Sequence, residues 1–134
     1  MLKKRFNIPI SIDFAVLLLR VVPSLFMMGH GWSKLSNVLN GDWSFADPIG
    51  VGEPISLVLT IFAELVCSIL VIVGFFTRPA LVILMVLCTV IIFIIHGADP
   101  IGDKEHAALF FAIYAAIFIT GPGRMSIDNR LFSR

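Results

Sequence analysis

The sequence predicts an all-α polytopic membrane protein, a four-transmembrane-helix bundle whose N- and C-termini are both cytoplasmic. Hydrophobic residues make up 58% of the 134 residues and charged residues only 14%, whereas a soluble domain averages roughly 45–50% apolar and 25% charged residues. A chain this short cannot bury so much apolar surface away from water, because small domains keep a large surface for their volume. We therefore expect one domain, residues 1–134, whose main partner is the lipid bilayer.

Four apolar segments approach the roughly 20 residues that a helix needs to cross a hydrocarbon core of ~30 Å. They are predicted over residues 12–32, 54–76, 79–96 and 106–121. Pro54 and Pro79 suit the first turn of a helix, where a missing N–H costs little. The last segment is short, and Gly121-Pro122-Gly123 ends it.

The basic residues predict which side of the membrane is cytoplasmic. With four spans, seven basic residues fall on one side and two on the other, and the positive-inside rule assigns the richer side to the cytoplasm. The richer set is Lys3, Lys4, Arg5, Arg78, Arg124, Arg130 and Arg134, and the poorer set is Lys34 and Lys104. The net charge of +1 is uninformative about nucleic acid, but the sequence has no basic patch interleaved with aromatic residues, so we expect no nucleic-acid partner.

Two ionisable residues, Arg20 and Glu64, lie well inside predicted spans. A charge there costs ~2.5–3.5 kcal/mol or more, so it normally faces the protein interior and has a partner. Helix rise places Arg20 ~12 Å and Glu64 ~18 Å from the cytoplasmic ends of their spans. The difference of ~6 Å is within reach of an arginine side chain, so we expect an Arg20–Glu64 ion pair. Such a pair either only aligns two helices or forms part of a polar pocket.

Three histidines are expected at one level near the outer membrane surface. His30 ends the first span, His96 ends the third and His106 begins the fourth, and Lys34 flanks the same level. Three imidazoles at one depth could bind a transition metal, or they could donate hydrogen bonds and protons to a quinone headgroup. Histidines are also tolerated wherever water reaches them, so the sequence alone leaves the metal open.

Cys67 and Cys88 lie within apolar runs, which argues against a disulfide framework or a zinc ribbon. Both are expected ~13 Å from the cytoplasmic ends of their spans. They are therefore interpreted either as a redox pair or as small packing residues. Two cysteines cannot hold an iron–sulfur cluster, and the chain has no flavin or haem motif.

Several motifs follow one another along nearly the whole chain. Arg20 in the first span is followed by His30-Gly31-Trp32-Ser33-Lys34-Leu35 at its end. Glu64 in the second span, a Gly-x-x-x-Arg turn from Gly74 to Arg78, and His96 at the end of the third span come next, and residues 121–128 read Gly-Pro-Gly-Arg-x-Ser-x-Asp. These motifs, in this order, resemble those of the DoxX family of small bacterial membrane proteins.

The resemblance implies a multi-pass protein of the bacterial cytoplasmic (inner) membrane and, more loosely, a redox function. Members of the wider family resemble the membrane subunit of thiosulfate:quinone oxidoreductase, and others are linked to membrane-bound oxidoreductase complexes that handle thiols. We therefore expect a quinone-linked oxidoreductase subunit that acts on small sulfur or thiol compounds. Its quinone pocket would hold Arg20, Glu64 and Lys34, and its proton-transfer residues would be His30, His96 and His106.

Two other functions stay open at this point. The chain could be a non-enzymatic scaffold that anchors soluble or membrane oxidoreductase subunits through its basic cytoplasmic face. It could also be a permease subunit for small solutes, in which case a chain of 134 residues would need to form a homo-oligomer to enclose a path.

Overall fold

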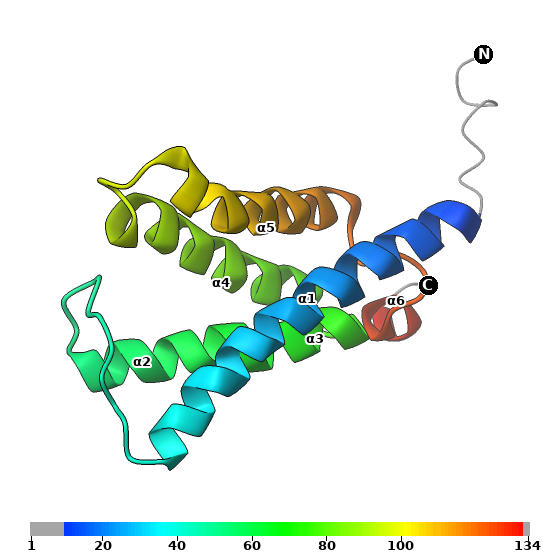
Figure 1. Ribbon diagram of the computed structural model, residues 1–134. Helices are drawn as coiled ribbons and strands as arrows, with labels where there is room; N and C mark the ends of the chain where they lie inside the picture. Colours follow the sequence, from blue (N-terminus) through cyan, green and yellow to red (C-terminus); the bar gives the residue numbers. More distant parts are fainter. Residues whose placement is uncertain (1–9, 133–134) are drawn as a thin grey trace.

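The computed structural model describes residues 10–132, and all the regular structure in that range is helical (Figure 1). The first helix, α1, spans Ile10–Leu39. The second long helix is continuous and consists of α2 (Glu53–Ile61), the π-helical segment η2 (Phe62–Cys67) and α3 (Ser68–Val73). Helix α4 (Thr77–Val90) continues into the π-helical η3 (Ile91–Ile95), and α5 (Ile101–Thr120) and the short α6 (Ile127–Phe132) follow.

The expected all-helical membrane fold is confirmed for this range. Three helical stretches are long and apolar enough to cross a membrane: Ile12–Leu39, Glu53–Val73 and Thr77–Ile95. Helix α5 packs against α4 and α1, and its 20 residues would extend ~30 Å. Unlike the three apolar stretches above, α5 carries charged residues in its first turns, namely Asp103, Lys104 and Glu105. A fourth membrane crossing and cytoplasmic termini therefore stay predictions.

Helix α1 extends further than the predicted first span, since it ends at Leu39 rather than at Trp32. It ends where Gly41 adopts a left-handed φ of 90°, a conformation that glycine tolerates without steric cost. The other helices begin and end within five residues of the predicted spans. The extension matters for the site, because it places Lys34 on a rigid helix instead of in a loop.

The alternating helix directions give the bundle two distinct ends (Figure 1). At the first, here called the terminal end, α1 begins, residues 74–76 join α3 to α4, and residues 121–126 lead into α6. At the second, here called the loop end, lie the loop 40–52 and the turn 96–100. Four residues of the predicted basic side, Lys3, Lys4, Arg5 and Arg134, lie outside the described residues.

The core lies between the four long helices and consists mainly of small and medium-sized side chains. Its fully buried members include Cys67, Val71, Leu81, Leu84, Cys88 and Tyr114. Large apolar side chains such as Phe26, Val86 and Phe93 instead cover the outside of the bundle. An exposed apolar surface of this extent is typical of a protein that lies in a membrane.

Candidate functional site

Arg20 does not form the predicted ion pair with Glu64. Its side chain is 1% exposed, and its guanidinium donates hydrogen bonds to main-chain carbonyl oxygens at the terminal end. The acceptors are Val71 (3.0 Å), Ile72 (2.8 Å), Pro122 (2.8 Å) and Met125 (2.8 Å). The last carbonyls of a helix have no partner within it, so the end of α3 offers Arg20 acceptors closer than any carboxylate. The prediction was wrong because it compared depth alone.

Gly74 allows the chain to close around this guanidinium. It ends α3 in the left-handed region, with φ 72°. A Cβ at this position would lie 2.5 Å from the Cβ of Ser126 and 2.9 Å from Nη2 of Arg20. Only glycine therefore fits between the arginine and the segment that follows α5.

The segment 121–128 is fastened to the rest of the terminal end by its two charged residues. The carboxylate of Asp128 accepts hydrogen bonds from the first backbone N–H groups around the start of α4, those of Phe76 (2.9 Å) and Thr77 (2.8 Å). Arg124 lies with its Nε 3.4 Å from Oδ2 of Asp13 on α1. The motif thus joins three helices around Arg20, and in this structure its role is to hold the fold together.

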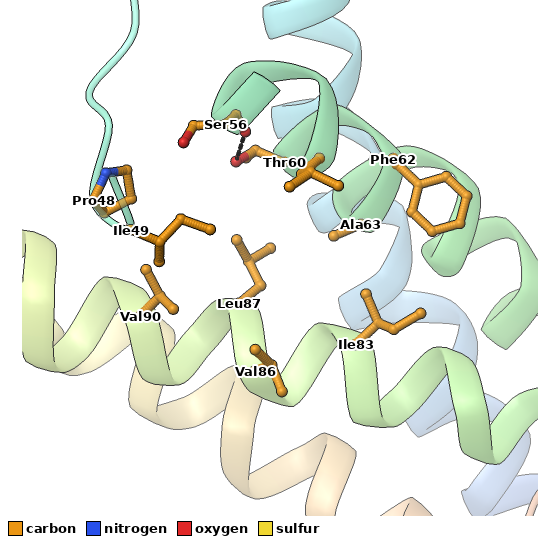
Figure 2. Close-up of a pocket in the computed structure, with 11 residues that line it drawn as sticks. Pro48, Ile49, Ser56, Thr60, Phe62, Ala63, Ile83, Val86, Leu87 and Val90 are labelled. Carbon is orange, nitrogen blue, oxygen red and sulfur yellow. Dashed lines mark hydrogen bonds between the residues drawn. The ribbon is translucent and has the colours of Figure 1, made fainter. Parts of the chain in front are cut away.

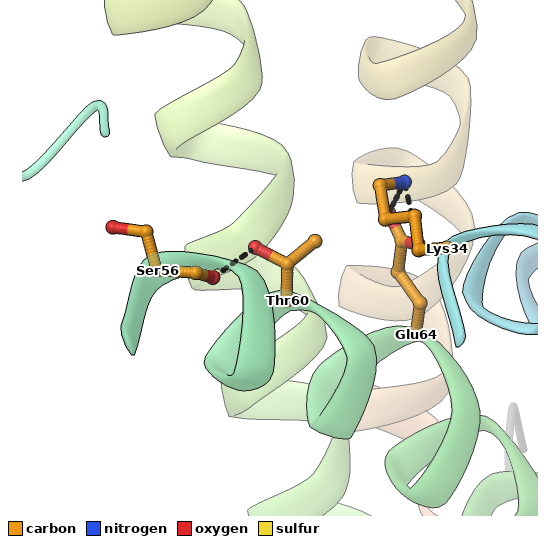
Figure 3. Close-up of polar contacts among 4 residues, drawn as sticks. All are labelled: Lys34, Ser56, Thr60 and Glu64. Carbon is orange, nitrogen blue, oxygen red and sulfur yellow. Dashed lines mark hydrogen bonds and ion pairs between the residues drawn. The ribbon is translucent and has the colours of Figure 1, made fainter. Parts of the chain in front are cut away.

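Glu64 pairs instead with Lys34, toward the loop end (Figure 3). Lys34 Nζ lies 2.8 Å from Oε2 and 3.0 Å from Oε1 of Glu64. The Glu64 side chain is 5% exposed and that of Lys34 is 28% exposed. An ammonium group has three N–H donors, so the two bonds to Glu64 leave one donor for a ligand. Two of the three residues predicted for the quinone pocket are therefore in direct contact.

Gly31 allows α1 to approach the segment that carries Glu64. A Cβ on Gly31 would lie 2.9 Å from the backbone nitrogen of Leu65 and 3.0 Å from the Cβ of Glu64. Lys34 follows Gly31 by three residues and so lies on the same face of α1. Glu64 itself lies in the π-helical η2, and short π-helical turns inside α-helices occur frequently at functional sites.

Gly31→Ala should destabilise the protein by ~1–3 kcal/mol, the usual effect of forcing an extra group into a packed contact. The added methyl would push α1 away from η2 and separate Lys34 from Glu64. Gly29→Ala is the matched control, because nothing lies within 4 Å of a Cβ at Gly29 and alanine favours a helix over glycine. Thermal unfolding of both variants in detergent measures the difference. Equal midpoints would contradict the close contact.

A cavity of about 80 Å³ lies beside the Lys34–Glu64 pair. The helices contribute Thr60, Leu87, Val90, Ile91 and Ile95 to its wall, and the loop 40–52 contributes Phe45 and Pro48. A cavity that holds benzene measures ~150 Å³. The space next to Glu64 therefore accommodates a small group, or the polar end of a larger molecule.

Asp47 fixes the loop 40–52 to the start of α2. Its carboxylate accepts hydrogen bonds from the backbone N–H groups of Val51 (3.0 Å) and Gly52 (2.8 Å) and from Oγ of Ser56 (2.7 Å). The Ser56 hydroxyl, followed by the backbone N–H groups, lowers the pKa of Asp47 below its ordinary value. This anchor holds Pro48 over the cavity. The Asp47-Pro48 pair in a glycine-containing loop is a signal of such a turn, which the sequence reasoning above did not use.

Acidification should release the loop 40–52. Because the folded-state pKa of Asp47 is lowered, its contribution to stability is complete above the ordinary aspartate pKa and is lost as the pH falls through the folded-state value. The emission of Trp43 in a Trp32→Phe background reports the loop. We expect a transition at acid pH that Asp47→Asn removes and that Asp42→Asn retains, since the Asp42 carboxylate accepts its hydrogen bonds from Ser44, within the same loop. The same transition in Asp47→Asn would contradict the anchor.

The three histidines lie toward the loop end but in different surroundings. His96 Nδ1 lies 2.8 Å from Oδ2 of Asp99. His106 lines a separate apolar pocket between α1 and α5, and His30 is exposed on α1. None of the three lines the cavity beside Glu64. Within the side chains that the structure describes, no three His, Cys, Asp or Glu residues are grouped to hold a metal ion.

Cys67 and Cys88 are both free and fully buried in the core. Reactive cysteines normally lie in partly exposed, electropositive surroundings, and the apolar cluster around these two thiols offers neither feature. Their surroundings therefore fit the packing interpretation, and the redox interpretation stays without structural support.

Comparisons with known proteins agree with the motifs. The DoxX family model matches residues 15–97, which include Lys34 and Glu64 but not the segment 121–128. An uncharacterized protein of Haemophilus influenzae is 33% identical over 124 residues, which cover 87% of this chain and 90% of that protein. No solved structure matches the chain at a comparable level of significance. The chain belongs to the DoxX family.

Proposed function

We propose that this chain is a quinone-binding subunit of a membrane oxidoreductase, with its site at the Lys34–Glu64 pair. One observation carries the proposal: a lysine and a nearly buried glutamate contact each other beside a cavity between apolar helices. The remaining N–H of Lys34 would donate to a quinone carbonyl oxygen. The carboxylate of Glu64 would accept a hydrogen bond from the hydroxyl of the reduced form. Both forms of the ligand therefore have a partner at one site.

The size of the cavity restricts how a quinone would lie. Its volume of about 80 Å³ is below the ~150 Å³ that holds a benzene ring. Only the oxygen-bearing edge of the ring would enter, and the ring itself would rest at the mouth between the helices. Lys34 and Glu64 then orient the headgroup and hold a proton, while the quinone carries the electrons.

The electron donor would be a small thiol or related sulfur compound, delivered by a partner oxidoreductase subunit. Oxidation of two thiols to one disulfide releases two electrons and two protons, and reduction of one quinone to its quinol consumes both. The reaction balances without a redox group in this chain. The membrane would be the bacterial cytoplasmic membrane, crossed four times, with the terminal end on the cytoplasmic side as the charge bias predicts.

Binding of menaquinone and ubiquinone to the purified protein in lipid nanodiscs tests the proposal. We expect saturable binding that Lys34→Gln and Glu64→Gln each weaken at least ~10-fold, equivalent to ~1.4 kcal/mol. Lys104→Gln is the matched control at the loop end, because Lys104 lies outside the cavity lining and its ammonium group donates to the carbonyl oxygen of Gly97. His30→Ala is also expected to bind normally. Absence of saturable binding in lipid would rule the proposal out.

A scaffold function is supported by a different observation, the exposed arginines at the terminal end. Arg78, Arg124 and Arg130 are all exposed there, and together they give this end a surface that acidic segments of soluble enzymes could bind. A variant with Arg78 and Arg130 changed to glutamine, which keeps the contact of Arg124 with Asp13, would lose its soluble partners in a pull-down but would bind quinone normally. The two functions are therefore separable by experiment.

A further inference from the structure

An apolar groove runs between the second long helix and α4 (Figure 2). Its volume is about 290 Å³. Ile49 of the loop 40–52 and Leu87 of α4 both point into it. The rest of its wall consists of Pro48, Ser56, Leu59, Thr60, Phe62, Ala63, Ile83, Val86 and Val90.

The groove lies next to the cavity beside Glu64. Four residues line both spaces: Pro48, Thr60, Leu87 and Val90. A molecule whose polar edge contacts Lys34 and Glu64 would therefore have the groove beside it for its apolar part. Both flanking helices lie in the apolar stretches Glu53–Val73 and Thr77–Ile95, so the groove opens toward the hydrocarbon region of the bilayer.

The groove offers no free hydroxyl group to a ligand. Its two polar side chains, Ser56 and Thr60, use their hydroxyls locally: Ser56 donates to Asp47 (2.7 Å) and Thr60 donates to the carbonyl oxygen of Ser56 (2.8 Å). Figure 3 shows the second of these bonds beside the Lys34–Glu64 pair. The exposed wall is therefore mostly hydrocarbon and has no hydroxyl hydrogen to donate, which suits a chain without polar atoms.

We infer that this groove holds the isoprenoid tail of the quinone and that the ligand enters sideways from the bilayer, between α2 and α4. The inference rests on the proposed function and adds the ligand class: long-chain quinones rather than water-soluble ones. Transfer of a tail from lipid to the groove brings little hydrophobic gain, because both surroundings are apolar. The groove therefore distinguishes a quinone tail from lipid chains by its shape. A bulky side chain that fills the groove would exclude the tail.

Variants that fill the groove from its exposed edge test this inference. Val86→Trp on α4 and Leu59→Trp on α2 add bulk at lining residues that are 57% and 50% exposed, so folding is not endangered. The matched controls are Val82→Trp and Val58→Trp, at positions that are 44% and 51% exposed and lie outside the groove lining. Binding of menaquinone and of a tail-less naphthoquinone is measured for each variant in nanodiscs.

We expect the groove variants to weaken menaquinone binding at least ~10-fold and to leave naphthoquinone binding within ~2-fold, with both controls unchanged. Unchanged menaquinone binding in the groove variants, together with Glu64-dependent naphthoquinone binding, would overturn the tail site and leave the proposed function intact. If neither quinone binds the parent protein, both proposals fail together.

A photolabelling experiment separates a quinone tail from a lipid chain as the occupant. One arm uses a quinone with a diazirine on its tail, and the other uses phosphatidylcholine with a diazirine on one acyl chain. We expect the quinone probe to label residues 56–63 and 83–90, and unlabelled menaquinone to displace both probes from them. Lipid labelling of the groove that persists at saturating menaquinone would contradict the inference.

Discussion

Arg20→Ala is expected to leave no stably folded bundle, because the carbonyl groups of Ile72, Pro122 and Met125 would lose their donor at once and that of Val71 would keep only the N–H of Gly74. Each buried polar group without a partner costs ~1–3 kcal/mol. Three such groups together cost ~3–9 kcal/mol, which is a large part of the free energy of unfolding of a typical protein, ~5–15 kcal/mol. The loss also frees the segment 121–128 from α3. Size-exclusion chromatography in detergent should show aggregated or degraded protein in place of a single monodisperse peak.

Arg20→Lys and Arg78→Ala give this prediction its internal controls. A lysine carries three donors without the planar fork of a guanidinium, so Arg20→Lys should fold but unfold at a temperature between those of the wild type and of any residual Arg20→Ala protein. Arg78 is exposed and makes one hydrogen bond of 3.3 Å, to Phe118, so its loss should cost within ~1 kcal/mol. If Arg20→Ala were as stable as Arg78→Ala, the hydrogen bonds of Arg20 would not have the stabilising role described here.

The same variants separate a structural role of Arg20 from a role in binding. Arg20 contacts the end of α3 and the segment after α5, whereas the proposed ligand site lies toward the loop end. The folded fraction of Arg20→Lys should therefore bind quinone with the affinity of the wild type. Weaker quinone binding by folded Arg20→Lys would indicate that Arg20 is part of the quinone pocket, as the sequence predicted.

The helices could be predicted from the sequence because apolar runs and helix-ending residues are local signals. Gly121-Pro122-Gly123 ends α5 as expected, since Gly121 and Gly123 both adopt a positive φ. The end of α1 was placed too early, because apolar character fades after Trp32 although the residues that follow still favour a helix. Hydropathy locates the hydrocarbon region, and a helix can continue beyond it.

The partners of the charged residues could not be predicted from depth alone. Arg20 and Glu64 lie on different helices at depths that differ by little, but the direction of a side chain depends on the rotation of its helix and on the acceptors nearby. A usable signal was present in the spacing of Gly31 and Lys34, because a glycine one turn before a lysine permits a close approach on that same face. The histidines illustrate the same limit, since a shared level does not place His96 and His106 in one pocket.

Removal of Lys34 and removal of Glu64 should destabilise the protein by different amounts. Breaking a buried ion pair by removing one partner typically costs ~3–5 kcal/mol, because the other charge is left unpaired. Lys34→Ala leaves a carboxylate that is 5% exposed and has lost its ammonium partner. Glu64→Ala leaves a lysine that is 28% exposed and whose long side chain can extend toward water. Lys34→Ala should therefore lower the thermal midpoint more than Glu64→Ala, measured for both variants in one detergent.

A double variant, Lys34→Met with Glu64→Met, separates the contribution of the pair to stability from its contribution to binding. Replacing a whole buried ion pair by apolar residues of similar size is often neutral or stabilising, so the double variant should unfold close to the wild-type midpoint. It removes the donor to the quinone carbonyl and the acceptor for the quinol hydroxyl together, so quinone binding should fall at least ~10-fold. A stable double variant that binds quinone normally would show that the pair only fixes α1 against η2. Stability with loss of binding is expected only if these two residues face the ligand.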